Sequence, residues 1–239
     1  MAESPFFTLH RDLPREGPGC RADLDAAIAQ ITLSDQARIL DAGCGPGADI
    51  GGLLAHAPDG HVTAVDGCAQ FIDQVKERWG ADPRVTALCC DMLDQTGPFD
   101  LIWSAGALYF LGIERALSEM YDRLTPGGAL IFSELVFLVP DPDEPLRRAL
   151  ETEYADIGPV PRLEARVRAA GFDLIASSTV SDDAWEAYYT PLDQRIEMLR
   201  PEAGADLAKV LNDAVAEAAM WRANKRAFGY AQIVAVKPS

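Results

Sequence analysis

Short apolar stretches alternate with helical ones along the first half of the chain. Five stretches of this kind are expected as strands, at residues 38–41, 62–66, 85–90, 99–104 and 129–133. Amphipathic segments lie around them and are expected as helices, at residues 22–31, 49–56, 69–79 and 113–124. Near-continuous apolar strands separated by helices are typical of a parallel sheet covered on both faces. Because crossovers between parallel strands are right-handed, the sequence predicts an α/β fold with a doubly wound open sheet.

The second half of the chain continues this pattern less regularly. Helices are expected over 143–155 and 162–170, and two further strands over 173–178 and 230–237. The excursion at 181–228 between those strands is too long for a hairpin loop. It contains a helix over 205–226 with an apolar stripe at i, i+3, i+4 spacing, which suits core packing, a lid or a dimer face.

The glycine-rich stretch LDAGCGPGAD, residues 40–49, follows the first expected strand. Its Gly43, Gly45 and Ala48 satisfy the dinucleotide pattern G-x-G-x-x-A, so a nucleotide phosphate is one ligand to consider. However, Asp41 stands two residues ahead of Gly43, and a fixed carboxylate there would repel a pyrophosphate. The loop therefore suits a ligand that carries an ammonium or sulfonium charge.

Polar residues close the expected strands, and ligands of such sheets bind outside the carboxyl ends of the strands. Asp66 lies about 20 residues after the glycine turn, where a carboxylate accepts the two hydroxyls of a ribose. Asp91 ends the third strand, where it could accept from an adenine amino group while the Met92 backbone N–H meets a ring nitrogen. Ser104 and Glu134 are expected at the ends of the fourth and fifth strands.

Five motifs in order resemble the class I S-adenosylmethionine-dependent methyltransferases: ILDAGCGPGAD, VTAVD, CCDM, FDLIWSAGALYFL and LTPGGALIFSE, within residues 22–134. The resemblance implies a seven-stranded sheet whose last strand is antiparallel and inserted between the fifth and sixth strands. It implies S-adenosylmethionine as cofactor and S-adenosylhomocysteine as product. The cofactor-binding residues that it implies here are Asp41, Gly43, Cys44, Gly45, Gly47, Asp66, Gly67, Asp91, Met92 and Ser104.

More narrowly, the chain resembles an uncharacterised bacterial group of methyltransferases that share R-x-G-P-G near the N-terminus. Here this motif is REGPG at residues 15–19, and GALYFLGIERAL at residues 106–117 matches a second motif of the group. Relatives often carry Glu just before that second motif, where this chain has Ala105. If that Glu binds or deprotonates the acceptor elsewhere, the role is missing or relocated here.

Methyl transfer from a sulfonium is an in-line displacement, so positioning and desolvation supply much of the catalysis. A base is needed when the acceptor is a hydroxyl or a protonated amine. The candidates are Tyr109, Glu134 and His10, although a packed aromatic, an exposed loop carboxylate and a capping histidine are the alternatives. Further candidates are an aromatic wall of Trp185, Tyr188 and Tyr189, and pairing of Arg11 and Arg15 with an acceptor carboxylate.

The formal net charge of −16 argues against nucleic acid or an anionic membrane as partner. No C-x-x-C pair occurs among the five cysteines, so no metal site is expected, and no long apolar stretch of a signal peptide opens the chain. We therefore expect a cytoplasmic protein, monomer or homodimer. We expect a single domain over 1–239, with an N-terminal cap at 1–31, a cofactor-binding core at 38–135 and helical insertions at 136–170 and 181–228 that cover the acceptor site.

The sequence thus predicts a methyltransferase that uses S-adenosylmethionine and acts on a small-molecule acceptor. Two alternatives remain open at this level: an NAD(P)-dependent oxidoreductase with the same glycine turn, and a non-catalytic binder of S-adenosylmethionine. Asp41 and Asp91 count against the oxidoreductase, whereas Ala105 gives slight support to the binder.

Overall fold

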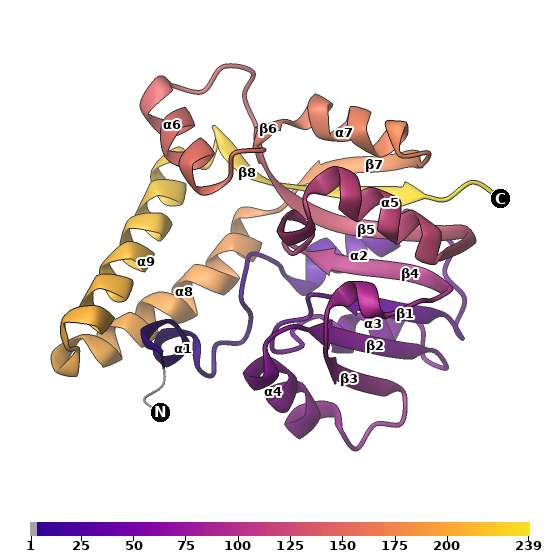
Figure 1. The fold of residues 1–239 in the computed structure, drawn as a ribbon, viewed down its shortest axis with the longest axis horizontal. Helices are drawn as coiled ribbons and strands as arrows, with labels where there is room; N and C mark the ends of the chain where they lie inside the picture. The colour runs from indigo at the N-terminus through magenta and orange to yellow at the C-terminus, as the bar shows by residue number, and fades with distance from the viewer. Residues whose placement is uncertain (1–3) are drawn as a thin grey trace.

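Seven strands lie side by side in one sheet, in the order β3-β2-β1-β4-β5-β8-β7 (Figure 1). The computed structural model describes residues 4–239. Strands β1 to β5 pair in parallel, and β8 is antiparallel to both β5 and β7. The strands are β1 (Arg38–Ala42), β2 (His61–Asp66), β3 (Val85–Cys89), β4 (Phe99–Ala105), β5 (Leu124–Phe137), β7 (Asp173–Thr179) and β8 (Phe228–Val236), with a short β6 (Gly158–Pro159) paired to β5. The doubly wound sheet and its inserted antiparallel last strand are confirmed.

Strand β5 is much longer than the predicted 129–133. It begins at Leu124, which pairs with Phe99, and it continues to Phe137, which pairs with Phe228 of β8. The long antiparallel partner stabilises the extra residues because it satisfies their backbone groups. Glu134 therefore lies inside the strand and not at its end, so the predicted position was wrong.

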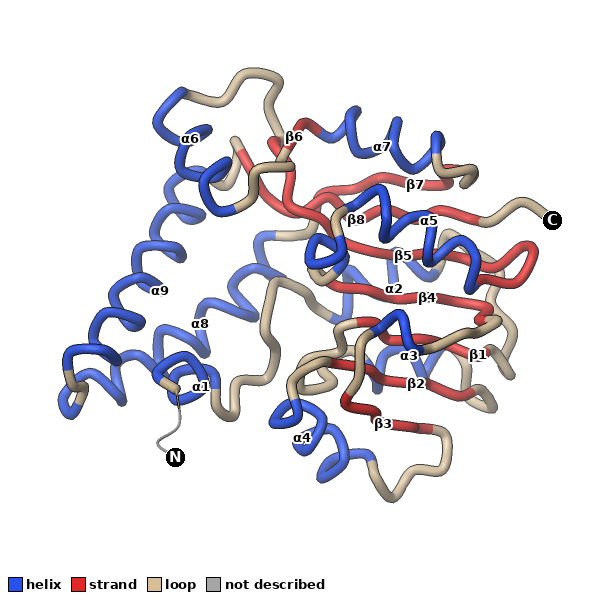
Figure 2. Tube along the Cα trace, viewed as in Figure 1, coloured by secondary structure: helices blue, strands red, loops and turns tan. Residues whose placement is uncertain are grey.

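Helices cover both faces of the sheet (Figures 1 and 2). Most lie within a few residues of the prediction, but α1 and α8 were not assigned from the sequence. Pro191 inside α8 interrupts the usual helical pattern, and α1 is only six residues long. The α-helices are α1 (Pro5–His10), α2 (Arg21–Ile28), α3 (Ile50–His56), α4 (Ala69–Trp79), α5 (Ile113–Arg123), α6 (Glu144–Glu153), α7 (Val160–Ala169), α8 (Asp182–Leu199) and α9 (Ala205–Asn224), with 3₁₀ turns η1 (Met92–Asp94), η2 (Leu108–Leu111) and η3 (Arg200–Glu202). No described helix is both long and apolar enough to cross a bilayer.

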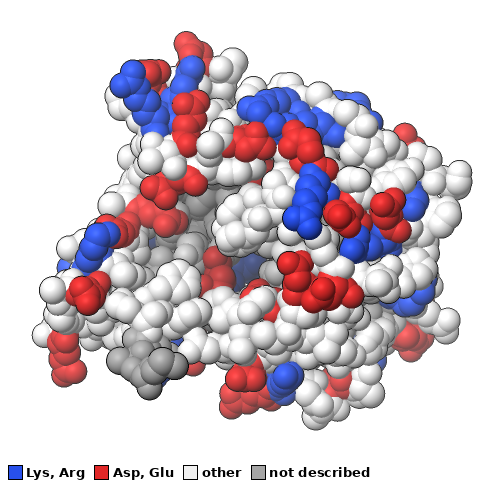
Figure 3. Space-filling model, in the orientation of Figure 1, with Lys and Arg blue, Asp and Glu red and all other residues white. Residues whose placement is uncertain are grey.

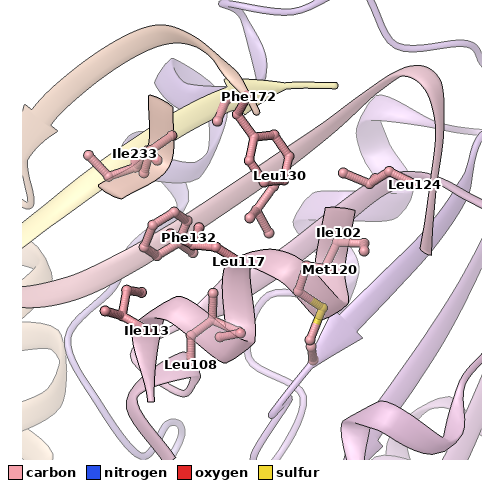
Figure 4. Close-up of a cluster of buried hydrophobic side chains, with 14 of the residues drawn as sticks. Ile102, Leu108, Ile113, Leu117, Met120, Leu124, Leu130, Phe132, Phe172 and Ile233 are labelled. Atoms are coloured by element: carbon pink, nitrogen blue, oxygen red, sulfur yellow. The ribbon is translucent and has the colours of Figure 1, made fainter. Parts of the chain in front are cut away.

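The apolar stripe of α5 explains how one face of the sheet is covered. Ile113, Leu117 and Met120 are fully buried at i, i+4 and i+7 and belong to one cluster with strand residues such as Ile102 and Phe132 (Figure 4). A second cluster, on α2, α3 and α4, packs against alternate residues of the same strands. Burial on both faces accounts for the near-continuous apolar strands.

A third buried cluster joins α1, α8 and α9 beyond the sheet. The Trp185 and Trp221 rings stack at 4.9 Å with an interplanar angle of 8°, which fastens α8 to α9. Leu211, Ala218 and Trp221 of the α9 stripe are buried here, so core packing accounts for those positions. In Figures 1 and 2 these two helices project from the sheet, with α1 against them, and so form one wall of the site.

Candidate functional site

A cleft of about 1560 Å³ opens at the carboxyl ends of the central strands. Its walls come from three parts of the chain: the N-terminal segment with α1, the loops after β1 to β4, and the helices α6, α8 and α9. The space-filling view is hollowed between the projecting helices and the sheet, and acidic side chains appear in and around the hollow (Figure 3). The cleft lies where a doubly wound sheet binds its ligands.

The glycine loop forms the floor of this cleft. Gly43, Gly45 and Gly47 have φ values of 75°, 51° and 79°, which only glycine adopts without strain. The backbone N–H of Gly43 donates to the Val65 carbonyl at 2.9 Å, so the loop is tied to β2. A Cβ at Gly43 would lie 2.4 Å from the Cβ of Ala107, and the loop therefore approaches the segment after β4 too closely for any side chain.

Asp66 and Asp91 stand at successive strand ends along the cleft. Asp66 accepts the Gly45 N–H at 2.9 Å and the Cys68 N–H at 2.8 Å. Asp91 accepts the Leu93 N–H at 2.8 Å at the start of η1. These backbone hydrogen bonds orient both carboxylates before any ligand arrives.

Asp41 is buried in the wall of the cleft, with 3% of its surface exposed. Its Oδ2 atom has no hydrogen-bond partner within residues 4–239. Burial raises the pKa of this carboxyl well above its usual range, Asp49 and Asp66 add to the shift, and Arg15 opposes it. A buried carboxyl oxygen without a partner indicates a place for a ligand that donates hydrogen bonds or carries positive charge.

Eight of the ten predicted cofactor residues line the cleft, and two do not. The Ser104 hydroxyl donates to the Ala42 carbonyl at 2.8 Å and is fully buried between β4 and β1. A Cβ at Gly47 would meet Ile50 at 2.9 Å and Val75 at 3.0 Å, so this glycine allows α3 and α4 to pack closely. The eight are Asp41, Gly43, Cys44, Gly45, Asp66, Gly67, Asp91 and Met92.

The REGPG motif fastens the N-terminal segment across the glycine loop. Arg15 donates through Nε to the Gly17 carbonyl at 2.6 Å and through Nη2 to Asp49 at 3.4 Å. Trp103 donates to the other Asp49 oxygen at 3.0 Å. A Cβ at Gly19 would lie 2.0 Å from Arg15 Nη2, so the guanidinium passes directly over this glycine. Arg15 is thus engaged by protein groups and does not reach into the cleft as a free cation.

His10 and Glu16 form a hydrogen-bonded pair in the cleft wall. Nδ1 of His10 lies 2.6 Å from Oε2 of Glu16, and the Phe6 ring stacks on the imidazole at 4.0 Å. Burial raises the pKa of Glu16, the hydrogen bond with His10 lowers it, and Oε1 of Glu16 has no partner in the described chain. The short contact through Nδ1 fixes the orientation of the imidazole, so Nε2 is the ring nitrogen that does not face Glu16.

Aromatic side chains from α8 and β8 also line the cleft. The ring centroids of Tyr188 and Tyr189 are 5.1 Å apart, and Trp185 meets Tyr230 edge-on at 5.1 Å. Tyr109 is 38% exposed in the cleft, and burial of the rest of its side chain, together with Glu134 and Glu217, raises its pKa to about 12. The structure therefore brings the predicted aromatic residues to one wall.

Glu134 lies away from the cleft lining and is 2% exposed. Tyr154 and Arg166 are near its carboxyl, but neither oxygen has a well-aligned hydrogen bond to any described residue. Burial raises its pKa to about 7, the Tyr154 hydroxyl lowers it and Asp156 adds to the rise. The structure does not bring Glu134 together with His10 or the glycine loop.

Among the cleft residues that sequence reasoning missed, three bear on the chemistry of the site: Glu16, Glu217 and Tyr230. Glu16 lies within the REGPG motif, which was the available signal. Tyr230 was expected only as part of a buried strand, and Glu217 only as a polar position on α9. Within residues 4–239, no group of three or more His, Cys, Asp and Glu side chains is arranged to hold a metal ion.

The carboxyl groups around the loop fit a ligand that is positively charged at one end. Asp41 and Glu16 both line the cleft at this loop, and each keeps one buried oxygen without a hydrogen-bond partner among the described residues. Asp66 and Asp91 offer fixed acceptors farther along the same edge. A phosphate at the loop would face these acidic side chains, whereas Arg15 beside it is already bonded to Asp49 and to the Gly17 carbonyl.

Part of the chain is similar to a known domain family. Residues 39–128 match the family model described as a methyltransferase domain. The malonyl-[acyl-carrier protein] O-methyltransferase of Enterobacter lignolyticus is 33% identical over 135 residues, which cover 55% of this chain and 50% of that protein. The trans-aconitate 2-methyltransferase of Paracidovorax citrulli is 28% identical over 173 residues, 68% of this chain and 65% of the relative. The chain thus spans half to two thirds of the length of these relatives.

Solved structures share the whole architecture. An S-adenosylmethionine-dependent methyltransferase from Geobacter sulfurreducens, in complex with S-adenosylhomocysteine, superposes with a TM-score of 0.81 at 21% identity, covering 98% of both chains. A second such methyltransferase complex, from Thiobacillus denitrificans, gives a TM-score of 0.79 at 20% identity, again with 98% of both chains covered. These comparisons show that residues 39–128 are similar to a methyltransferase domain and that the chain shares the fold of the two solved structures.

Proposed function

We propose that this protein transfers a methyl group from S-adenosylmethionine to a small-molecule acceptor in the cleft. The observation that carries the proposal is the buried Asp41 oxygen beside the glycine loop, which has no hydrogen-bond partner among residues 4–239 and lies in the segment that matches the methyltransferase domain. The two unsatisfied carboxyl oxygens at this loop suit the ammonium and sulfonium charges of this cofactor. The same charges disfavour the pyrophosphate of NAD(P), so the oxidoreductase alternative has no support here.

Three groups of residues would hold the cofactor. The glycine loop, with Asp41, would receive the methionine end. Asp66 would accept the ribose hydroxyls, because its carboxylate is already oriented by Gly45 and Cys68. Asp91 would accept from the adenine amino group. When bound, the cofactor supplies a methyl group that is activated by its attachment to a positively charged sulfur.

The remaining walls would form the acceptor chamber. The cap predicted at 1–31, of which residues 1–3 lie outside the described part of the chain, would close it over the glycine loop. The insertions at 136–170 and 181–228 would cover the other side of the core at 38–135. Compact covering by both ends of the chain favours a small acceptor, and the net charge of −16 disfavours a nucleic acid. The curated relatives are named for malonyl-[acyl-carrier protein] and trans-aconitate as acceptors. Sequence similarity alone does not assign either acceptor to this chain.

His10 is our candidate for the general base. Its Nδ1 hydrogen bond to Glu16 directs Nε2 to take a proton, and both side chains line the cleft. Tyr109 would help to orient the acceptor, because it faces the same space. Glu134 was a sequence candidate for catalysis, but its burial outside the cleft lining gives it no contact with an acceptor.

Calorimetric titration with S-adenosylhomocysteine tests the proposal. The parent protein should bind one equivalent, and Asp66→Asn should lower the affinity by about tenfold or more, because hydrogen bonds to a charged group are lost. Asp59→Asn is the matched control, since Asp59 is exposed just before β2 at the opposite end of the strands. Absence of binding to the parent protein, or saturable binding of NADH by fluorescence in its place, would overturn the proposal.

A further inference from the structure

The charge of the cleft is strongly unbalanced. Among the described residues that line it, eight are Asp or Glu and two are Lys or Arg. Four of the acids, Asp41, Asp49, Asp66 and Asp91, stand on the glycine-loop side. The others extend the negative charge to the walls beyond: Glu16, Glu153, Asp213 and Glu217. An anionic acceptor would enter against this field, whereas a cationic one would be drawn in.

Neither cation of the cleft lining is available to pair with an acceptor carboxylate in the interior. Arg15 bonds to Asp49 and to the Gly17 carbonyl, and its side chain is 11% exposed. Lys209 is 78% exposed and pairs with Asp213 at 2.7 Å, four residues along α9. The sequence-based expectation that Arg15 binds an acceptor carboxylate is therefore not favoured by the structure.

Glu217 brings a carboxyl group to the aromatic wall. Tyr189 donates to its Oε1 at 3.0 Å, and the side chain remains accessible from the cleft. Desolvation by the surrounding protein raises the pKa of the Glu217 carboxyl, whereas the hydrogen bond from Tyr189 and the nearby His10 lower it. His10 and Glu217 therefore line the same space, from helices α1 and α9 that pack against each other.

Aromatic rings complete this space. Tyr188 lines the cleft together with Glu217 and Tyr230, and its ring lies 5.1 Å from that of Tyr189, which donates to Glu217. Tyr230 reaches the segment after β4, where a Cβ at Gly106 would lie 2.9 Å from the Tyr230 ring. The aromatic wall is thus continuous with the glycine loop. Electron-rich rings beside a carboxylate are the usual surroundings of a bound organic cation.

We propose that the methyl acceptor is a small amine that is protonated in solution, held between Glu217 and the aromatic rings of Tyr188 and Tyr230. This inference rests on the proposed methyltransferase function and adds the chemical class of the acceptor. The amine has to be neutral to react, and His10 would hold the proton that it gives up.

A matched set of three probes tests the acceptor class: 2-phenylethylamine, 2-phenylethanol and 3-phenylpropionate, with a wider panel of small amines and carboxylic acids. Each is titrated by calorimetry into the protein saturated with S-adenosylhomocysteine, in 0.15 M salt. We expect saturable one-to-one binding among the amines and none among the matched alcohols and acids. Equal or tighter binding of the acids, or no binding by any amine of the panel, overturns the inference.

Two variants distinguish amine binding in the chamber from attraction of the amine by the net negative charge of the protein. Glu217→Gln should weaken amine binding by about tenfold, because a partly desolvated charge partner is lost. Glu197→Gln, at an exposed position of α8 outside the cleft lining, should leave it unchanged. If the two substitutions weaken amine binding equally, the net charge of the protein explains the binding and the proposal is overturned. Titration with S-adenosylhomocysteine alone comes first, so a failure of the proposed function is recognised separately from a failure of the amine class.

Discussion

The imidazole Nδ1 of His10 lies 2.6 Å from the Glu16 carboxylate, and both side chains line the cleft. His10 comes from α1 and Glu16 from the REGPG motif, so the pair depends on how the N-terminal segment crosses the glycine loop. Glu16 itself packs beside Gly45. The candidate base is therefore held by the same segment that closes the cofactor side of the cleft.

His10→Asn should lower the turnover number for methyl transfer to an amine acceptor by about a hundredfold or more, because the proton acceptor is removed. Asn keeps a group that can hydrogen-bond to Glu16, so binding of S-adenosylhomocysteine should be unaltered. Transfer from labelled S-adenosylmethionine and calorimetry measure the two effects. His56→Asn, on α3 and outside the cleft lining, is the control. Unchanged turnover of His10→Asn would contradict the assignment of the base.

The Arg15→Lys variant should loosen the N-terminal segment. The guanidinium donates from Nε to the Gly17 carbonyl and from Nη2 to Asp49, and a lysine amine cannot make both hydrogen bonds in this geometry. Loss of about 1.4 kcal/mol of local stability would speed backbone hydrogen exchange in residues 4–19 by about tenfold. The measurement is exchange followed by mass spectrometry. Arg78→Lys on the exposed surface of α4 should give the parent pattern, and equal exchange in the two variants would argue against the fastening role of Arg15.

Gly43→Ala should destabilise the ligand-free protein by at least about 2 kcal/mol. The substitution strains a backbone at φ 75°, and its methyl group would lie 2.4 Å from Ala107. Urea unfolding measures the change in the free energy of unfolding. Gly17→Ala is the comparison, because no atom lies within 4 Å of a Cβ added there. A similar cost for both substitutions would show that the close approach to Ala107 is unimportant.

Glu134→Gln should stabilise the protein at high pH and have a smaller effect in acid. Burial raises the folded-state pKa of Glu134 from 4.5 to about 7, so the neutral carboxyl is favoured in the fold. Its contribution to stability is complete below pH 4.5 and is lost as the pH rises through about 7. The full loss corresponds to about 3 kcal/mol, since one pKa unit is about 1.4 kcal/mol.

We therefore expect the advantage of Glu134→Gln over the parent to grow by about 2 kcal/mol between pH 5 and pH 9. Urea unfolding at both pH values checks this. An exposed carboxylate, Glu151 of α6, provides the control as Glu151→Gln. An advantage that does not change with pH would mean that the carboxyl is already ionised, or solvated, in the folded protein.

The sequence was sufficient for the sheet and for the carboxylates at its edge. Parallel strands that are buried on both faces have a distinctive apolar pattern, and the topology alone brings Asp41, Asp66 and Asp91 to one edge. The glycine loop was recognisable because glycine is required where φ is positive, as at Gly43. Local sequence therefore carries the information for this half of the site.

The chamber walls could not be predicted in the same way. The inward position of Tyr230 depends on pairing of β8 with β5, and burial of Glu134 depends on the full length of that pairing. The His10 pair requires α1 to pack against α8 and α9, which lie almost two hundred residues away along the chain. Contacts of such long range leave no periodic signal in the sequence.

The place of β8 in the sheet has a consequence for the order in which the protein is made. This strand, Phe228–Val236, is the last along the chain, yet it lies between β5 and β7 and pairs with both. Until it leaves the ribosome, β5 presents an unpaired edge and β7 has no neighbouring strand within the described sheet. Open edges of this kind invite pairing with other chains. A nascent chain halted shortly before residue 228 would therefore depend on chaperones to keep it from aggregating.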